Sequence, residues 1–219
     1  MIAPMAPGSL INIYGSQLAD HSGQFSGFPL PHEIAGTRVR IADKSIPLIY
    51  VSGDRIIAQV PYDAGVDTTG QLVVERGSTQ SIPEAQPIAS AQPGVFTVNQ
   101  QGTGQAVVTV GNTANLADAA HPVSERDVIV IYCAGLGAVE PAVESGTAAA
   151  SNPLSRTETP VVTIGGKRAQ VQFAGLTPGF AGLYQINAVV PAGVTPGNDV
   201  SLQLTIAGQS SPVVTIAVR

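Results

Sequence analysis

Tryptophan is absent from this sequence, cysteine occurs only once, and lysine and arginine together contribute ten residues. A single cysteine excludes an internal disulfide. Cys133 lies inside the apolar run Val128–Ala134 with no histidine nearby in sequence, so we expect a buried core residue and not a catalytic thiol. The ten basic residues are scattered along a chain of net charge −5 and form no basic stripe to neutralise phosphates, which argues against nucleic-acid binding.

Long apolar runs and abundant charge are missing as well. No run approaches the roughly 20 apolar residues that cross a membrane, and we expect no membrane span. Charged residues make up 11% of the chain, whereas roughly 25% is typical of soluble proteins. Glycine (24 residues) and proline (17 residues) are plentiful beside many short apolar stretches. This composition is typical of an all-β protein whose turns need special backbone angles.

Two pairs of similar stretches predict how the chain is organised. Tyr184–Val194 has the pattern of a strand that ends in a Pro-Gly turn, and Arg55–Val66 is a weaker copy of it. Ile129–Leu136 likewise lies over Ile11–Leu18 without a gap. The two halves of the chain therefore come into register, which indicates an internal duplication.

Each half contains about seven short strands spaced every 8–12 residues, a pattern that predicts two tandem immunoglobulin-like β-sandwiches. We expect the first sandwich at residues 1–91 and the second at 92–219, where a connecting hairpin comes first. Within the first half, 39–41 and 46–51 are predicted to pair as a hairpin. Prolines 83 and 87 mark residues 82–88 as an edge strand, where a missing N–H donor costs least.

Three motifs carry a family resemblance that covers nearly the whole chain: Ala6–Gly15, Tyr132–Gly137 and Phe173–Pro191. Together they resemble an uncharacterised domain family of exported acidobacterial proteins that is named for Solibacter. Each half is also similar to an IPT/TIG-type immunoglobulin-like domain. The resemblance implies a secreted or cell-surface protein without known catalytic residues. The first residues of this sequence lack the charged and apolar regions of a signal peptide.

No convergent set of residues for catalysis or for a cofactor emerges. His21, His32 and His121 lie in turn-rich loops, and a His21/His32 metal pair has no third ligand at a recognisable spacing. The loop acids lack the alternating spacing of a calcium loop and a setting that raises the pKa of a glycosidase acid; they are Asp63, Asp67, Asp118, Glu125, Glu140, Glu144 and Glu158. We therefore predict a protein that is not an enzyme and has no cofactor, and a calcium site built from separate loops stays open.

Loop side chains are the remaining candidates for a contact surface. Five aromatics fall in predicted strands and are expected in the core or at a corner of the sandwich: Tyr14, Tyr50, Tyr132, Phe173 and Tyr184. The candidate contact surface consists of four loop aromatics and one loop hydroxyl: Phe25, Phe28, Tyr62, Thr177 and Phe180.

The loop that carries Phe180 distinguishes the two halves. Gly175–Leu183 is longer than the corresponding Ser52–Arg55, so the second half has an extended loop at this position. No motif assigns a function to this loop. Phe180 either contributes to a contact surface or folds back over the end of the sandwich.

These observations favour a non-catalytic extracellular structural or adhesive module, with self-assembly into a surface layer or filament as one form of it. The expected partners are copies of the chain, neighbouring domains of a longer chain, or a cell-surface glycan. Self-association would use sheet edges or the apolar start at residues 1–6. Two alternatives stay open: a glycan-binding module that uses the Phe25/Phe28 and 175–183 loops, and an accessory domain of a larger exported enzyme.

Overall fold

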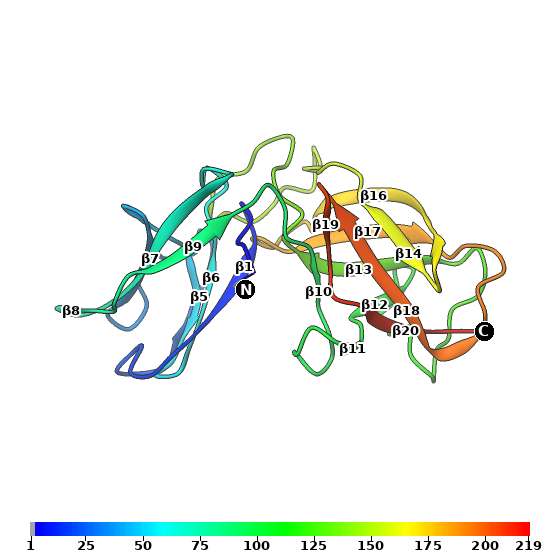
Figure 1. The fold of residues 1–219 in the computed structure, drawn as a ribbon, viewed down its shortest axis with the longest axis horizontal. Helices are drawn as coiled ribbons and strands as arrows, with labels where there is room; N and C mark the ends of the chain where they lie inside the picture. Colours follow the sequence, from blue (N-terminus) through cyan, green and yellow to red (C-terminus); the bar gives the residue numbers. More distant parts are fainter. Residues whose placement is uncertain (1–2) are drawn as a thin grey trace. The chain divides into compact units, whose positions relative to one another are not determined.

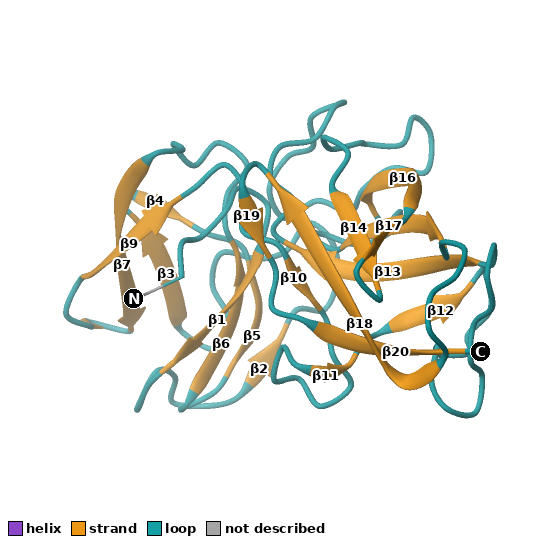
Figure 2. Cartoon of the chain, turned by 45° about the vertical axis from the view of Figure 1, so that its right-hand side comes forward, coloured by secondary structure: helices purple, strands orange, loops and turns teal. Residues whose placement is uncertain are grey.

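The computed structural model describes residues 3–219, and within this range the chain consists of strands and loops without a helix (Figures 1 and 2). Two residues of the apolar start, 1 and 2, lie outside the described range. The predicted all-β fold is confirmed. No helix of the described part has the length and hydropathy to cross a membrane.

Backbone contacts divide the chain into two compact units. Unit 1 comprises the residues up to Ala91 together with Gly137–Ser155 and Thr177–Gly182. Unit 2 comprises Gln92–Leu136, Arg156–Leu176 and Leu183–Arg219. The chain thus passes from unit 1 to unit 2 after residue 91 and then returns to unit 1 twice. The division into domains 1–91 and 92–219 stays a prediction. That prediction did not include the two segments that return to unit 1.

Unit 1 is a sandwich of two antiparallel sheets. The first sheet has the order β1-β6-β5-β2 and is formed by β1 (Leu10–Tyr14), β2 (Gly23–Gln24), β5 (Leu48–Val51) and β6 (Arg55–Gln59). The second has the order β4-β3-β7-β8, with β9 also paired to β7; its strands are β3 (Thr37–Ile41), β4 (Lys44–Ser45), β7 (Thr68–Arg76), β8 (Thr79–Gln80) and β9 (Glu84–Ile88).

Side-chain alternation explains the core of unit 1. In β3, Val39 and Ile41 are buried whereas Arg38 is exposed, because successive side chains of a strand point to opposite faces. Both sheets contribute one apolar face to a common core, whose buried members include Ile46, Leu48, Val51, Ile56, Ala58, Leu72, Val74 and Ile88.

Unit 2 also has two sheets. The first has the order β10-β13-β17-β16, with β12 also paired to β13; its strands are β10 (Gly94–Val95), β12 (Val108–Val110), β13 (Val128–Ala134), β16 (Gln170–Leu176) and β17 (Tyr184–Val189). The second has the order β11-β20-β18-β14-β15, with β19 also paired to β18; its strands are β11 (Gly104–Gln105), β14 (Val161–Ile164), β15 (Lys167–Arg168), β18 (Gly197–Ile206), β19 (Gln209–Ser210) and β20 (Val214–Val218).

The two units share one order of strands. β13, β17 and β16 are neighbours in unit 2 as β1, β6 and β5 are in unit 1, and β14, β15, β18, β19 and β20 pair as β3, β4, β7, β8 and β9 do. This is the correspondence that the alignment of the two halves leads us to expect. The origin of the chain by duplication stays a prediction.

The predicted hairpin of residues 39–41 and 46–51 is wrong beyond residue 46: Ile46 N still donates to the carbonyl of Val39 at 2.9 Å, but residues 48–51 belong to the other sheet. β4 pairs with β3, whereas β5 pairs with β6 in the other sheet. Pro47 lies between β4 and β5 and has no N–H to continue a ladder. The edge position of residues 82–88 is confirmed, since β9 pairs with β7 on one side and makes one isolated bridge, Met5↔Ile88, on the other.

A buried side chain of β6 fixes the returning segment 137–155 within unit 1. Gln59 is fully buried, and its Oε1 accepts a hydrogen bond of 2.6 Å from the backbone N of Gly146. Gly146 has a φ of +82°, and a Cβ there would come within 3.2 Å of Cγ of Pro47. Glycine is therefore required where the segment meets β6.

We expect Gln59→Leu to lower the unfolding free energy of unit 1 by about 1–3 kcal/mol, because it leaves the buried N–H of Gly146 without its acceptor. Native-state hydrogen exchange of unit 1 amides measures this free energy for the unit by itself. The matched control is Gln71→Leu on the exposed face of β7, with an expected change within about 0.5 kcal/mol. Equal losses in both variants would contradict the role of Gln59.

Candidate functional site

A turn after β6 places two polar side chains at the end of unit 1. Pro61 ends the strand because it has no N–H, and the backbone N of Ala64 donates to its carbonyl at 3.1 Å. The resulting turn has Tyr62 and Asp63 at its two central positions. A proline follows the strand in both halves of the sequence, and in unit 1 it begins a turn with two polar side chains.

The returning segment 137–155 adds a second set of polar groups beside this turn. Ser145 Oγ accepts a hydrogen bond of 3.0 Å from the backbone N of Tyr62. Leu30 N donates to the carbonyl of Gly146 at 2.7 Å. Thr147 Oγ1 donates to the carbonyl of Glu144 at 2.6 Å, which closes a short turn. Glu144 is thus held next to Tyr62 although the two are far apart in sequence.

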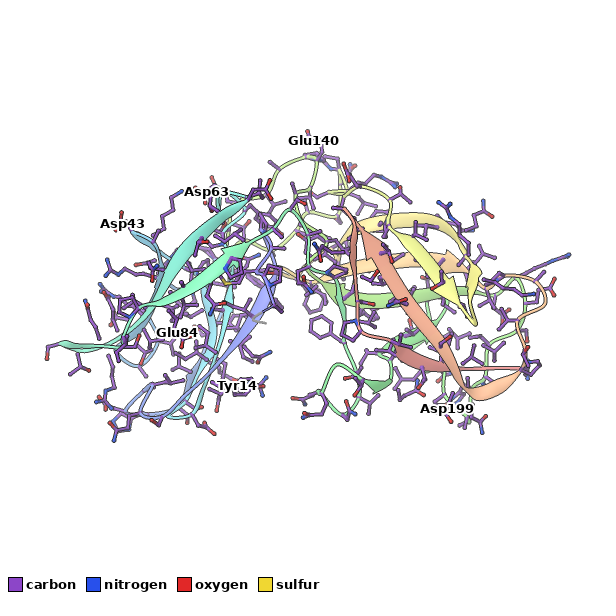
Figure 3. All side chains as sticks on the ribbon, viewed as in Figure 1. Tyr14, Asp43, Asp63, Glu84, Glu140 and Asp199 are labelled. Carbon is purple, nitrogen blue, oxygen red and sulfur yellow. The ribbon has the colours of Figure 1, made fainter. Side chains whose placement is uncertain are left out.

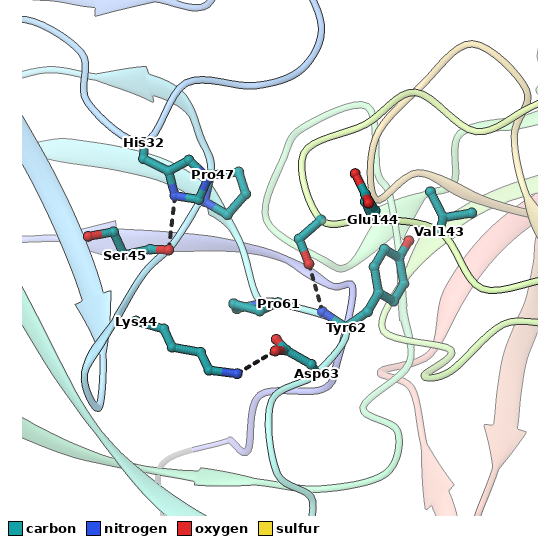
Figure 4. A pocket seen from close by; sticks show the side chains of 10 residues that line it. His32, Lys44, Ser45, Pro47, Pro61, Tyr62, Asp63, Val143 and Glu144 are labelled. Atoms are coloured by element: carbon teal, nitrogen blue, oxygen red, sulfur yellow. Dashed lines mark hydrogen bonds and ion pairs between the residues drawn. The ribbon is translucent and has the colours of Figure 1, made fainter.

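These elements enclose a hollow of about 400 Å³ that Figure 4 shows from close by. Its walls come from β4, from the Pro61 turn, from residues 143–145 and from the loop before β3. Its lining includes three charged side chains and one imidazole ring: Lys44, Asp63, Glu144 and His32. The Tyr62 ring stands next to Val143 and gives the hollow an apolar side.

A second hollow of about 290 Å³ adjoins the first. Lys44, Pro61 and Asp63 line both hollows, which are therefore neighbours in unit 1. The second hollow adds apolar side chains of Ile41 and Ile88 and the threonines of β7. We call the two hollows together the Lys44–Asp63 groove.

The charges of the groove are partly neutralised. Lys44 Nζ forms an ion pair with Asp63 Oδ2, and both side chains are exposed. No ion pair joins Glu144 to another residue in the described range. Nδ1 of His32 lies 2.9 Å from the carbonyl of Ser45, which only accepts, so Nδ1 carries a proton and donates. In the neutral ring Nε2 then remains an acceptor.

The groove offers hydrogen-bond donors and acceptors together with apolar surface, but it does not offer a recognisable metal site. Within residues 3–219, no group of three or more His, Cys, Asp or Glu side chains is placed to hold a metal ion. The Asp63/Asp67 calcium option therefore gains no further ligand from the described fold. Asp63 is instead the ion-pair partner of Lys44.

Of the five predicted contact residues, Tyr62 lines the groove and the other four do not. Phe25 and Phe28 lie next to each other, with ring centroids 5.4 Å apart and planes tilted by 42°. Phe28 is 43% exposed and Phe25 is half-buried. They form a separate aromatic pair in the loop around β2.

Thr177 and Phe180 belong to the second returning segment, 177–182. The carbonyl of Phe180 accepts a hydrogen bond of 2.9 Å from Ala149 N, while its ring is 52% exposed. Thr177 is buried, and its hydroxyl has no hydrogen-bond partner in the described range. A Cβ on Gly182 would lie 2.8 Å from Cδ2 of Leu10, so this segment packs tightly on unit 1. Residues 177–182 belong to unit 1, so the backbone does not fold back over the sandwich of the second half, and the Phe180 ring stays exposed.

Sequence reasoning missed four groove residues as a set: His32, Lys44, Asp63 and Glu144. It considered His32, Asp63 and Glu144 one at a time and assigned them to solvated loops. The available signal was the Tyr-Asp pair after Pro61, because the corresponding positions after Pro191 are alanine and glycine. A difference between two otherwise similar turns indicates a local role.

The remaining titratable candidates lie outside the groove. At His121, the backbone N–H donates to Asp118 Oδ1 at 3.0 Å and lowers the pKa of this carboxyl, so the pair closes a surface turn. Cys133 is fully buried in β13, and burial raises the pKa of its thiol.

We expect Cys133 to remain unmodified by iodoacetamide at pH 8 in the folded protein, because the reagent needs an accessible thiolate. After unfolding in guanidinium chloride the same thiol is modified. Intact mass spectrometry measures both states. Rapid labelling of the folded protein would contradict the position of Cys133 in the core.

Comparison with known proteins gives little to add to this geometry. No family model matches the chain, and no curated protein matches it. Among solved structures, the chain is similar to SGBP-B of the mixed-linkage glucan utilization locus of Bacteroides ovatus, solved in complex with a mixed-linkage heptasaccharide. The identity is 12% and the TM-score is 0.41, over 99% of this chain and 44% of that one.

This chain therefore spans less than half the length of the Bacteroides protein. At that TM-score the similarity supports no inference about a ligand or an activity. The resemblance to the Solibacter-type family and to IPT/TIG domains is untested by these comparisons and stays a prediction.

Proposed function

We propose that this protein is a non-catalytic glycan-binding module of an exported or surface protein, with the Lys44–Asp63 groove as its binding site. The observation that carries the proposal is a pair of adjacent hollows that share the Lys44–Asp63 ion pair in their walls. Two adjacent hollows with polar groups in each fit a chain of similar units better than one compact ligand.

The chemistry of the lining supports a saccharide. A sugar ring presents hydroxyls, which both donate and accept hydrogen bonds, and apolar C–H faces. The groove offers the Glu144 carboxylate and the His32 ring as polar partners. Tyr62 and Pro61 offer apolar surface on the same walls.

The balance of charge supports a neutral ligand. Lys44 is already paired with Asp63, and Glu144 and Asp43 add negative charge at the rim. A phosphate or sulfate group would meet these carboxylates and be repelled. A neutral oligosaccharide avoids that repulsion and still uses the carboxylates as acceptors.

The structural or adhesive role that the sequence favours is a second candidate. The open edge of β1, described in the next subsection, is the observation that favours it. The two roles use different surfaces of unit 1, so one protein can have both.

Isothermal titration calorimetry of the full chain against neutral hexasaccharides of glucose, xylose and mannose tests the glycan proposal. We expect one of them to bind, and Glu144→Ala and His32→Ala each to weaken that binding about tenfold, the loss of a hydrogen bond to a charged or polar group. Two controls carry the same kinds of change outside the groove: Glu158→Ala in unit 2 and Phe180→Ala in the returning segment. Both are expected to bind as the wild type does.

Two results would overturn the groove as the site. One is the absence of binding to every hexasaccharide. The other is binding that Phe180→Ala abolishes and Glu144→Ala retains, which would move the site to the 177–182 segment.

A further inference from the structure

The two units can be compared position by position at one side of the sandwich. β1 pairs with β6 in the register in which β13 pairs with β17, and β9 pairs with β7 as β20 pairs with β18. Met5 N donates to the carbonyl of Pro87 at 2.8 Å in unit 1. Val123 N donates to the carbonyl of Ala217 at 3.0 Å in unit 2. Met5 and Val123 therefore occupy equivalent positions.

In unit 2 the residues that precede Val123 cover the free side of β13. Within residues 92–122, β10 and β12 pair with β13 in antiparallel orientation, and β11 pairs with β20 in parallel. Tyr132 N donates to the carbonyl of Val107 at 3.2 Å, and Gly111 N donates to the carbonyl of Val128 at 2.7 Å. This segment satisfies the main-chain groups of β13 that point away from β17.

In unit 1 the same side of β1 is an open edge, because within the described residues β1 pairs with β6 alone. Gly15 N donates to the carbonyl of Asp54 at 3.1 Å, which shows that odd-numbered positions direct their main-chain groups towards β6. These directions alternate along an antiparallel strand. The N–H and C=O groups of Leu10, Asn12 and Tyr14 therefore point to the open edge.

Side chains at this edge are less buried than their counterparts in unit 2. Ile11 and Ile13 are half-buried, whereas Ile129 and Ile131 are fully buried under their additional strands. Tyr14, labelled on β1 in Figure 3, is 71% exposed. A groove of about 400 Å³ follows the edge. Its apolar lining includes Met5, Ile11, Ile13 and Leu72.

The opposite wall of this groove is polar. Glu84 and Gln86 on β9 stand where unit 2 has the fully buried Val214 and Ile216. Gln86 Nε2 lies 3.4 Å from Glu84 Oε2. Among the described residues that line the groove, Glu84 has the one charged side chain. A strand that fits here has apolar residues towards β1 and a cation towards Glu84.

We propose that unit 1 accepts an extended segment of another polypeptide chain along β1. The segment lies antiparallel to β1, places two apolar residues beside Ile11 and Ile13, and directs a lysine or arginine at Glu84. Main-chain hydrogen bonds to Leu10, Asn12 and Tyr14 supply affinity, and the two kinds of side chain supply selectivity. Unit 2 contains the template for this arrangement in its own β12.

The probe is therefore a capped peptide with the sequence of residues 104–111 that carries the change Gly104→Lys. In unit 2 the three strand residues of this segment, 108–110, lie opposite positions that correspond to Ile13, Asn12 and Ile11. Residue 104 pairs with Val214, whose counterpart is Glu84, and paired residues direct their side chains to the same face. We expect saturable binding of one peptide per full-length chain, measured by fluorescence anisotropy.

Three changes test the geometry. Asn12→Pro removes the outward N–H of β1 and is expected to weaken binding about tenfold, while Asn12→Ala, which loses the same side chain, leaves it unchanged. N-methylation of the peptide amide that corresponds to Thr109 removes the matching donor without touching the fold of the protein, with the same expected loss. Glu84→Gln is expected to weaken binding about two- to fivefold, as for an exposed ion pair.

Analytical ultracentrifugation of the chain without peptide completes the experiment. The proposal is supported if the chain is a monomer that binds the peptide and if N-methylation of the peptide weakens that binding. The proposal is overturned by the absence of saturable binding, or by binding that neither Asn12→Pro nor N-methylation changes. A dimer that Asn12→Pro dissociates would also overturn it, since the occupant would then be β1 of a second copy.

Discussion

The buried hydrogen bond from Gly146 to Gln59 is the interaction on which the polar end of unit 1 depends. It holds the segment 137–155 against β6 at a point where only glycine fits. The segment then brings Ser145 to the backbone of Tyr62 and Glu144 to the wall of the groove. The hydrogen bonds from Leu30 N to the Gly146 carbonyl and from Tyr62 N to Ser145 Oγ add to this contact, so a segment far from the Pro61 turn in sequence faces it in the fold.

The two proline turns show how one scaffold supports different surfaces. In unit 1, Lys44 pairs with Asp63 of the Pro61 turn. In unit 2, Lys167 donates instead to the carbonyl of Ala192 at 3.2 Å, and a Cβ on Gly193 would lie 2.7 Å from its Nζ. The backbone arrangement is similar, but the chemistry of the groove depends on side chains that only the first turn has. Fold and site are therefore separate properties of this chain.

The open edge of β1 and the covered edge of β13 are two answers to one problem, the unpaired main-chain groups of a strand at the edge of a sheet. An unpaired strand edge presents N–H and C=O groups that template further pairing, and natural proteins cover or charge such edges. Unit 2 covers its edge with residues 92–122. Unit 1 instead places the charge of Glu84 across the groove. A charge at this position limits non-specific pairing and, in our proposal, selects the partner that is accepted.

The sequence by itself determined the all-β class, the repeated strand pattern, the edge position of β9 and the burial of Cys133, because strand alternation and proline placement are local properties of the chain. It also identified Tyr62 as a contact candidate. Only the tertiary structure decided that β4 and β5 belong to different sheets, that 137–155 and 177–182 return to unit 1, and that Glu144 lies beside Tyr62. Those features depend on hydrogen bonds and packing between residues dozens of positions apart, which no local pattern encodes.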